Sequence, residues 1–266
     1  MLVQWQENRM NTLEETIRKS LSRKKILLMT HLVLGYPSFT VNRQVIKEMV
    51  ENGVDLIELQ IPFSEPMADG PMILKANQEA ISRGTKVKDC LQFSREITSE
   101  FHIPFLFMTY YNILFKYGVE EFILHSDAIN IKGFIIPDLP PEEGQEYTEI
   151  VKKRNLAPIQ IFAPTSTEQR MKLLAENGAG FIYCVARRGV TGKKTDFDHD
   201  FNAYIARCRK ATSLPLAVGF GIRSKKDIDF LAGKADIAVI GTETIRIVDE
   251  KGADAVGPFI AGLLSA

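Results

Sequence analysis

Two carboxylates that lie close together in the sequence have the surroundings expected of an acid/base pair. Glu58 lies within the apolar run Asp55–Ile61, which has the composition of a buried strand, and Asp69 follows on a loop punctuated by proline and glycine. A charge inside a buried strand is costly unless it is paired, neutralised or solvated through a cleft, so such groups occur mostly where they do chemistry. We therefore expect Glu58 and Asp69 to be catalytic. Alternatively, Glu58 pairs with a lysine or arginine and Asp69 only forms a turn.

Two glycine turns near the C-terminus could bind a phosphate group. Gly219-Phe220-Gly221 and Gly241-Thr242 each end a strand-like run, and backbone N–H groups at such turns suit a dianion. The alternative is that these glycines only form tight turns. A polar, glycine-containing segment, residues 187–195, is expected to form a lid that closes over a ligand and excludes water. It could equally be a solvated surface loop.

The chain alternates short apolar runs with amphipathic segments, and these elements must position the groups above. The expected strands are Ile26–Leu34, Asp55–Ile61, Phe105–Tyr110, Gly133–Pro137, Pro158–Ala163, Gly180–Val185, Leu216–Gly219 and Ile237–Gly241. The expected helices are Val41–Val50, Val87–Ser99, Glu120–His125, Glu142–Lys153, Thr167–Ala175, Phe201–Ala211, Ser224–Leu231 and Gly252–Leu264. Thr12 followed by Glu15 predicts an extra N-terminal helix that begins with a capping box.

Eight β/α alternations without a linker predict an α/β protein with one (β/α)8 TIM barrel, a single domain over residues 1–266. In such a barrel, catalytic groups project from the carboxyl ends of the strands, and the loops after strands seven and eight bind phosphate. An open doubly wound sheet is the alternative, but it would more naturally carry an early GxGxxG turn, which is absent.

Composition excludes several classes of function. Lysine plus arginine and aspartate plus glutamate number 33 each, which disfavours nucleic acid and anionic membranes as partners. Cys90, Cys184 and Cys208 are odd in number and lack CxxC spacing, so neither a disulfide framework nor a metal site is expected. The polar N-terminal segment does not read as a signal peptide, and no apolar run is long enough to span a bilayer. We expect a cytoplasmic protein.

Six sequence blocks, in order along nearly the whole chain, carry a closer resemblance. They are Glu58-Leu59-Gln60-Ile61-Pro62-Phe63-Ser64 with Ala68-Asp69-Gly70-Pro71, Met108-Thr109-Tyr110-Tyr111-Asn112, Pro137-Asp138-Leu139-Pro140, Ala163-Pro164-Thr165-Ser166, Arg187 with Gly189-Val190-Thr191-Gly192, and Gly219-Phe220-Gly221-Ile222. With these blocks the chain resembles the family of tryptophan synthase α subunits.

The resemblance implies a lyase of tryptophan biosynthesis. Such a lyase cleaves indole-3-glycerol phosphate to indole and glyceraldehyde 3-phosphate in a retro-aldol reaction. It works in an αββα complex with a β subunit, to which indole passes. No cofactor is expected in this chain, because pyridoxal phosphate belongs to the β subunit.

The resemblance also implies roles for individual residues. Glu58 would protonate C3 of the indole ring and accept the glycerol hydroxyl proton, while Asp69 would remain ionised and stabilise the indoleninium form through the ring N–H. Tyr183 would border the indole site, and Thr191 would lock the lid over Asp69. The other implied contacts form a phosphate site of Gly192, Gly221, Gly241 and Thr242. Candidate walls of the apolar indole pocket are Phe220, Ile135, Phe162 and Met108, each of which could equally belong to the core.

The chain departs from the family pattern at several positions. Glu65 stands where an aspartate is common, on a loop implied to touch the β subunit, and Ala186 replaces a usual serine before the lid. His31 takes a position that is often aromatic and apolar. There it would either tune the pocket or be a satisfied buried histidine.

Two other functions stay open. The chain could act mainly as an allosteric activator of the β subunit with weakened lyase activity, although the intact Glu58 and Asp69 argue against this. It could be another phosphate-binding barrel, such as an indole-3-glycerol-phosphate synthase or a ribulose-phosphate epimerase. A catalytic strand lysine or metal-binding histidines, respectively, would then be expected. The implied partner surface consists of Pro62, Phe63, Glu65 and the Asp138–Pro140 turn.

Overall fold

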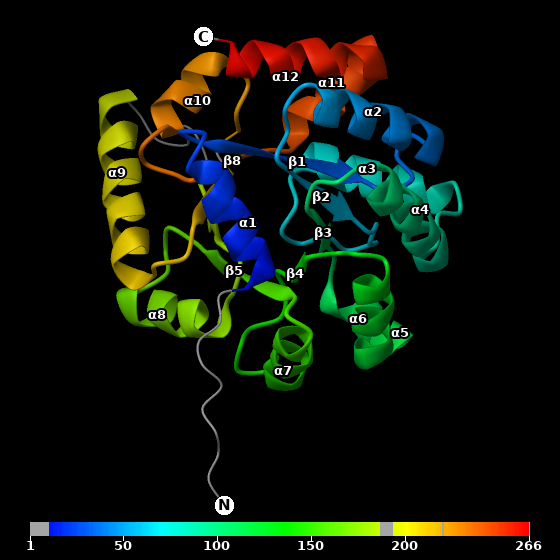
Figure 1. The fold of residues 1–266 in the computed structure, drawn as a ribbon, viewed down its shortest axis with the longest axis horizontal. Helices are drawn as coiled ribbons and strands as arrows, with labels where there is room; N and C mark the ends of the chain where they lie inside the picture. Colours follow the sequence, from blue (N-terminus) through cyan, green and yellow to red (C-terminus); the bar gives the residue numbers. More distant parts are fainter. Residues whose placement is uncertain (1–10, 187–193, 220, 266) are drawn as a thin grey trace, which may run out of the picture.

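Eight parallel strands close into a barrel in the computed structural model of this protein, with β8 hydrogen-bonded back to β1 (Figure 1). The structure describes residues 11–186, 194–219 and 221–265, and for residues 194–199 the backbone alone. The strands are β1 (Leu27–Val33), β2 (Leu56–Gln60), β3 (Phe105–Met108), β4 (Gly133–Ile135), β5 (Ala157–Phe162), β6 (Ile182–Val185), β7 (Leu216–Gly219) and β8 (Ile237–Ile240). The helices are α1 (Thr12–Leu21), α2 (Phe39–Glu51), α3 (Pro71–Ser82), α4 (Val87–Glu100), α5 (Tyr111–Tyr117), α6 (Val119–Ala128), α7 (Gln145–Lys153), α8 (Glu168–Asn177), α9 (Lys194–Ala211), α10 (Lys225–Leu231), α11 (Thr242–Lys251), the 3-10 turn η1 (Ala253–Ala255) and α12 (Val256–Leu264). The predicted TIM barrel is confirmed.

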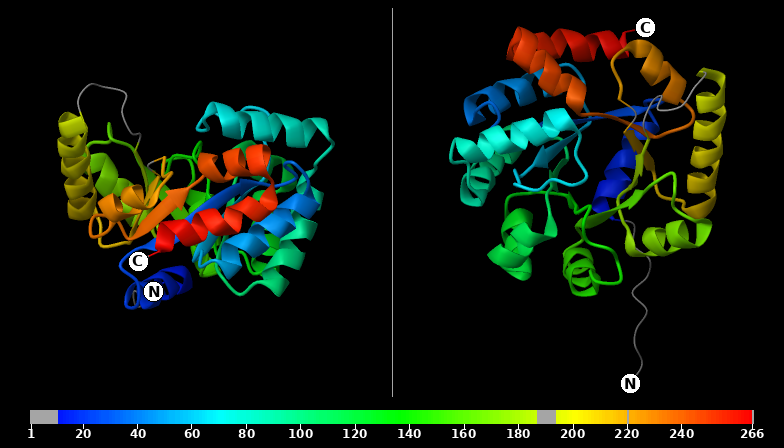
Figure 2. Two further views of the ribbon diagram at one scale, coloured as in Figure 1. Left: turned by 90° about the horizontal axis from the view of Figure 1, so that it is seen from above. Right: turned by 180° about the vertical axis from the view of Figure 1, so that it is seen from behind.

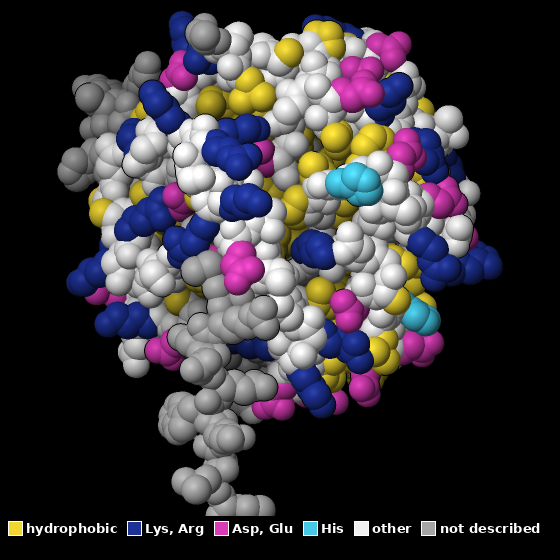
Figure 3. Space-filling model, viewed as in Figure 1, with side chains coloured by type: hydrophobic (Ala, Val, Ile, Leu, Met, Phe, Trp, Pro, Cys, Tyr) yellow, Lys and Arg dark blue, Asp and Glu magenta, His cyan; other side chains and the backbone are white. Residues whose placement is uncertain are grey.

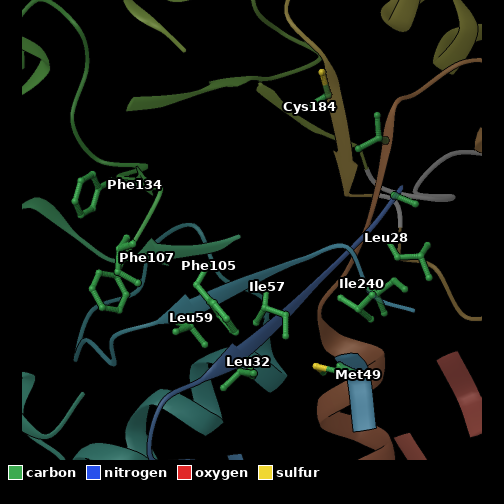
Figure 4. Close-up of a cluster of buried hydrophobic side chains, with 14 of the residues drawn as sticks. Leu28, Leu32, Met49, Ile57, Leu59, Phe105, Phe107, Phe134, Cys184 and Ile240 are labelled. Atoms are coloured by element: carbon green, nitrogen blue, oxygen red, sulfur yellow. The ribbon is translucent and has the colours of Figure 1, made fainter. Parts of the chain in front are cut away.

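Side chains alternate along the strands between the barrel interior and the surrounding helices, as the pleat of a strand requires. On β1, Leu27 and Met29 belong to the interior cluster, whereas Leu28 and Leu32 pack outwards against the helices. Figure 4 shows part of this outer layer, which also includes Met49 of α2. Both faces of the strands are therefore covered, and this explains strand sequences that are apolar without strict alternation.

Helix α1 closes the amino end of the barrel. Its Leu13 and Ile17 are buried in the interior cluster with Leu27, at the start of β1, and α1 lies across the barrel in Figure 1. The capping box expected at Thr12 is wrong by one residue, because Asn11 is the N-cap and its side chain accepts a hydrogen bond from the backbone of the second helical residue. Since α1 blocks this end, a ligand must enter at the carboxyl end of the strands.

The sequence prediction misses three helices, α3, α5 and α11. Helix α3 begins with Pro71, a position that suits proline because its missing N–H needs no partner there. Helix α11 begins directly after β8, with Gly241 as its N-cap. Three expected helix starts are also wrong: α7 begins at Gln145 rather than Glu142, α9 begins at Lys194, seven residues before Phe201, and α12 begins at Val256, after η1, rather than at Gly252.

Charges of both signs cover the outer surface. On the face drawn in Figure 3, lysine and arginine side chains are interspersed with carboxylates. Within the part of the chain that the structure describes, no helix has the length and apolarity needed to cross a membrane. The view from behind in Figure 2 shows the end of the barrel opposite α1, where the loops that follow the strands carry the candidate site.

Candidate active site

Glu58 lies in the middle of β2, and its side chain points into the barrel. Leu56, two residues earlier on the same face of the strand, belongs to the interior cluster, and Glu58 itself is only 3% exposed. The strand register places Glu58 beside His31 of β1 and Leu106 of β3. Its Oε1 atom lies 3.3 Å from Nδ1 of His31. Among the described residues, the ion-pair partner of Glu58 is thus this histidine rather than a lysine or arginine.

Asp69 lies on the loop between β2 and α3, where two side chains hold its carboxylate. The Gln60 side chain donates a hydrogen bond from Nε2 to Asp69 Oδ2 at 2.6 Å. The Tyr110 hydroxyl donates a longer hydrogen bond of 3.3 Å to the same oxygen, and it accepts one from the backbone N–H of Ala68 at 3.0 Å. Gln60 follows Glu58 by two residues on the same face of β2, so the two carboxylates are brought to one end of the barrel.

Burial and neighbouring charges shift the protonation of this site. Burial raises the pKa of Asp69, and it outweighs the opposing effects of His31 and of the Gln60 hydrogen bond. Burial lowers the pKa of His31, but the Glu58 carboxylate, with smaller contributions from Asp69 and Gln60, raises it more, so the net pKa lies above the ordinary value. Because burial disfavours the anion of Asp69, it opposes the expectation that this residue remains ionised.

Three buried side-chain atoms of this site have no hydrogen-bond partner among the described residues. They are Nε2 of His31, Oε2 of Glu58 and Oε1 of Gln60. An unsatisfied buried polar atom costs about 1–3 kcal/mol, so such atoms are rare in folded proteins and each one needs an explanation. The three residues occupy inward positions on the neighbouring strands β1 and β2. A bound ligand with polar groups of its own would supply the missing partners.

His31 is therefore buried, with 4% of its surface exposed, but it is not the satisfied histidine that was one of the two expectations. Its Nδ1 faces Glu58, while its Nε2 has no partner. The expectation that His31 tunes the pocket is the one that its position favours.

Tyr183 points into the same interior from β6. Its hydroxyl lies against Gly219 of β7, where an added Cβ atom would come within 3.2 Å of the phenolic oxygen. Burial raises the pKa of Tyr183 well above its ordinary value, and the charges of Glu58 and Asp69 raise it further. The residue predicted to border the indole site thus lies close enough to both carboxylates to feel their charge.

Helix α11 begins at this end of the barrel without a side-chain cap. Gly241 is its N-cap, Thr242 its first residue, and no side chain caps it. At α10, by contrast, the Asp227 carboxylate accepts hydrogen bonds from the backbone N–H groups of Arg223 and Ser224. Backbone N–H groups of α11 therefore stay available to an anion.

Gly221 follows β7 with a φ of +70°, which is the left-handed region that favours glycine. This conformation turns the chain sharply after the strand. A side chain is disfavoured there, so the backbone of this turn stays accessible to a ligand.

Glu243 in the first turn of α11 carries a charge that by itself would repel an anion. Two arginines compensate it: Arg246 donates from Nε to Glu243 Oε2 at 3.1 Å, and Nε of Arg223 lies 3.8 Å from the same oxygen. The N-terminus of α11 therefore does not face an uncompensated carboxylate.

Some predicted contacts lie outside the described residues, and for one candidate wall the structure favours the alternative, a core position. Thr191, Gly192, Phe220 and the lid segment 187–193 fall outside the described ranges. Of the other expected pocket walls, Ile135 and Met108 belong to the interior cluster. Phe162 belongs to the outer cluster, because Ala157, Ile159 and Ile161 set the inward phase of β5 and Phe162 is one residue out of step.

The sequence analysis missed the roles of Gln60 and Tyr110. Gln60 could have been found, because the period of two in a strand puts it on the same face as Glu58. Tyr110 could not, because its contact with Asp69 joins residues 41 apart in the sequence. Over the described ranges, no group of three or more histidines, cysteines and acidic residues could hold a metal ion.

The chain is similar in sequence and in fold to known proteins of one family. The family described as "Tryptophan synthase alpha chain" matches residues 17–257. A tryptophan synthase alpha chain of Desulfotalea psychrophila is 62% identical over 252 residues, which are 95% of this chain and 99% of that one. A structure of Mycobacterium tuberculosis tryptophan synthase superposes with a TM-score of 0.88 at 28% identity, covering 96% of this chain and 97% of that one. The tryptophan synthase complex of Pyrococcus furiosus gives 0.82 at 26% identity, covering 90% and 97%.

Proposed function

This chain belongs to the tryptophan synthase alpha chain family, and we propose that Glu58 and Asp69 perform the family's lyase reaction in it. The reaction cleaves indole-3-glycerol phosphate to indole and glyceraldehyde 3-phosphate. The observation that carries this assignment is that Oε2 of the buried Glu58 has no hydrogen-bond partner among the described residues, while the charge of Glu58 acts on Asp69. A carboxyl that only filled the barrel would have its oxygens paired.

The reaction needs one acid/base group and one fixed negative charge. Glu58 gives a proton to C3 of the indole ring, and the ring nitrogen becomes positively charged. Asp69 stabilises that charge through the ring N–H, where it develops. The bond between C3 and C1′ then breaks, its electron pair returns to the ring, and the C1′ hydroxyl becomes an aldehyde. The hydroxyl proton passes to Glu58, so the carboxyl ends the cycle as it began.

The substrate phosphate would rest at the carboxyl ends of β7 and β8. Gly221, Gly241 and Thr242 supply backbone N–H groups there, and the uncapped start of α11 adds the positive end of its dipole. Tyr183 would border the indole ring, with Met108 and Ile135 as further apolar wall. Thr191 and Gly192 complete the proposed site as the lid threonine and a further phosphate contact.

The partner is the β subunit of tryptophan synthase, which holds the pyridoxal phosphate and accepts the indole; this chain itself would need no cofactor. The docking surface that we propose includes Glu65 and the Asp138–Pro140 turn. The Asp138 carboxylate accepts the backbone N–H of Tyr111 at 2.9 and 3.1 Å, which fixes this turn to the start of α5. Two large apolar side chains are exposed nearby in sequence, Met67 on the loop after β2 and Phe115 on α5. Exposed apolar groups of this size often mark an interface. We place the assembly in the cytoplasm.

The decisive experiment is an indole-release assay of the isolated chain carrying Glu58→Gln. We expect kcat to fall by about 10²-fold or more, because the amide cannot exchange the proton. Glu176→Gln is the matched control, since Glu176 is exposed on the last turn of α8, at the amino end of the barrel. Near-normal turnover of Glu58→Gln would remove Glu58 from its role. Absence of indole release from the wild-type chain without β subunit would instead favour a mainly allosteric function.

The partner surface is tested separately by Pro140→Ala. We expect weaker activation of the β subunit with unchanged indole release by the isolated chain, because the turn lies outside the reacting groups. Pro258→Ala, at an exposed position of α12, is the control. Unchanged activation in Pro140→Ala would contradict the assignment of this surface.

A further inference from the structure

The buried pair of His31 and Glu58 is more than a means of neutralising a carboxylate. Both residues are almost fully buried, on inward positions of adjacent strands, with Nδ1 and Oε1 3.3 Å apart. A pair that only neutralised charge would have its remaining polar atoms paired as well. Within the described part of the chain, Nε2 of His31 and Oε2 of Glu58 both lack partners.

The surroundings of His31 contain few other groups that titrate. On the side of β8 and α11, Gly241 lies near the Cβ atom of His31, and the Thr244 hydroxyl donates a hydrogen bond to the His31 backbone carbonyl. The titratable groups whose charges couple to the pair are Asp69 on the β2–α3 loop and Tyr183 on β6. No described lysine or arginine forms an ion pair with either member.

We propose that His31 is a positioning residue for the lyase reaction, forming with Glu58 one acid/base unit that presents Oε2 to the substrate. The inference rests on the proposed function and deepens it. Nδ1 of His31 fixes the carboxylate through Oε1. Oε2, which lacks a partner among the residues that the structure describes, is then the oxygen that exchanges a proton with C3 and afterwards with the hydroxyl.

Proton balance follows from treating the two residues as one unit. In the reacting tautomer the unit holds one exchangeable proton, on Oε2 of the carboxyl group, while Nδ1 of His31 faces Oε1. That proton goes to C3 of the indole ring, and the hydroxyl proton replaces it when the C3–C1′ bond breaks. No other donor or acceptor is needed. As the pH rises through the raised pKa of His31 the unit loses its proton, and activity declines.

The first test compares His31→Phe and His31→Asn with the wild-type chain in the indole-release assay. Phenylalanine keeps an aromatic ring but removes both nitrogens, and we expect kcat to fall about 10- to 100-fold with KM changed less than about threefold. The asparagine amide nitrogen lies close to where Nδ1 was, so His31→Asn should recover part of kcat. Both variants should lose the alkaline limb of the wild-type pH profile. His102→Phe, at an exposed position, is the control.

The second test measures the pair directly and does not depend on activity or on the folding of His31→Phe. Imidazole NMR signals of the four histidines are titrated in the wild-type chain and in Glu58→Gln. We expect one histidine to titrate above its ordinary value of 6.5 in the wild-type chain and below it in Glu58→Gln, because burial then acts without the opposing carboxylate.

Three results would overturn the inference. The first is that the wild-type chain releases indole and His31→Phe has the same kcat and the same pH profile. The second is a loss of kcat of the expected size in His31→Phe while the alkaline limb of its pH profile is retained, which would indicate a packing role alone. The third is a set of histidine titrations unmoved by Glu58→Gln. A wild-type chain that releases no indole would refute the proposed function itself, and with it the role of His31 in that reaction.

Discussion

The amide of Gln60 offers a sensitive test of how the site holds its second carboxylate. It donates to Asp69 at 2.6 Å, and Gln60 is fully buried. Gln60→Met removes the amide and keeps nearly the same volume, so the barrel interior should not collapse or overpack. Of its hydrogen bonds to described side chains, Asp69 then keeps the longer one from Tyr110.

The size of the effect follows from the lost hydrogen bond. A hydrogen bond to a charged group contributes about 1.5–3 kcal/mol, and one pKa unit corresponds to about 1.4 kcal/mol. Because the Gln60 hydrogen bond lowers the pKa of Asp69, its loss should raise that pKa by about one to two units. Asp69 must be ionised to stabilise the ring cation, so the acid limb of kcat/KM should move to higher pH by the same amount.

The assay is indole release by the isolated chain as a function of pH. The matched control is Gln92→Met, because the Gln92 amide also donates to a carboxylate, Glu96 at 3.1 Å, but on the exposed surface of α4. That variant should leave the profile unchanged. Carboxyl carbon NMR of Asp69 gives a second measure of the same shift.

An acid limb that stays in place in Gln60→Met would refute this reasoning. It would mean either that Asp69 does not need to be ionised or that the Gln60 amide does not act on it. The NMR titration separates the two: a shifted carboxyl signal with an unmoved acid limb removes Asp69 from its catalytic role, and an unshifted signal removes Gln60.

Three further predictions concern the same end of the barrel. Gly219→Val should raise KM about tenfold, because its Cβ would lie 3.2 Å from the Tyr183 hydroxyl and displace the ring; an unchanged KM would show that the ring does not border the substrate. Tyr110→Phe leaves the backbone N–H of Ala68 without its acceptor and Asp69 without one donor. For a loss of about 1–2 kcal/mol, kcat/KM should fall about 5- to 30-fold, and wild-type kinetics would contradict this. Asp69→Asn should be inactive yet more stable than the wild-type chain at neutral pH. Because the pKa of Asp69 is raised in the folded state, the wild-type free energy of unfolding falls as the pH rises from about 4 through that pKa, by about 1.4 kcal/mol per pH unit. Urea unfolding at pH 4 and pH 7.5 checks it, and an equal difference between variant and wild type at both pH values would count against it.

The architecture of the barrel, and the two carboxylates proposed as its acid/base pair, could be predicted from the sequence alone. Apolar strand runs that alternate with amphipathic helices can bury their surfaces in few ways, and eight such units without a linker favour a closed barrel. A glutamate in a buried run is conspicuous because of its desolvation cost alone, so Glu58 could be selected with no knowledge of its neighbours. Gly241 was assigned to a phosphate site from the same kind of local pattern.

The neighbours that act on those residues became visible in the folded barrel and could not be predicted from local sequence. His31 meets Glu58 through the register of two strands, and Tyr110 meets Asp69 across 41 residues of sequence. Register depends on the packing of the whole barrel, so no local pattern encodes it. The same holds for Phe162, where a shift of one residue in phase turns a predicted pocket wall outwards. The residue types of a short segment are enough to select the candidate reacting groups. The closed barrel fixes the partners of these groups and hence their protonation.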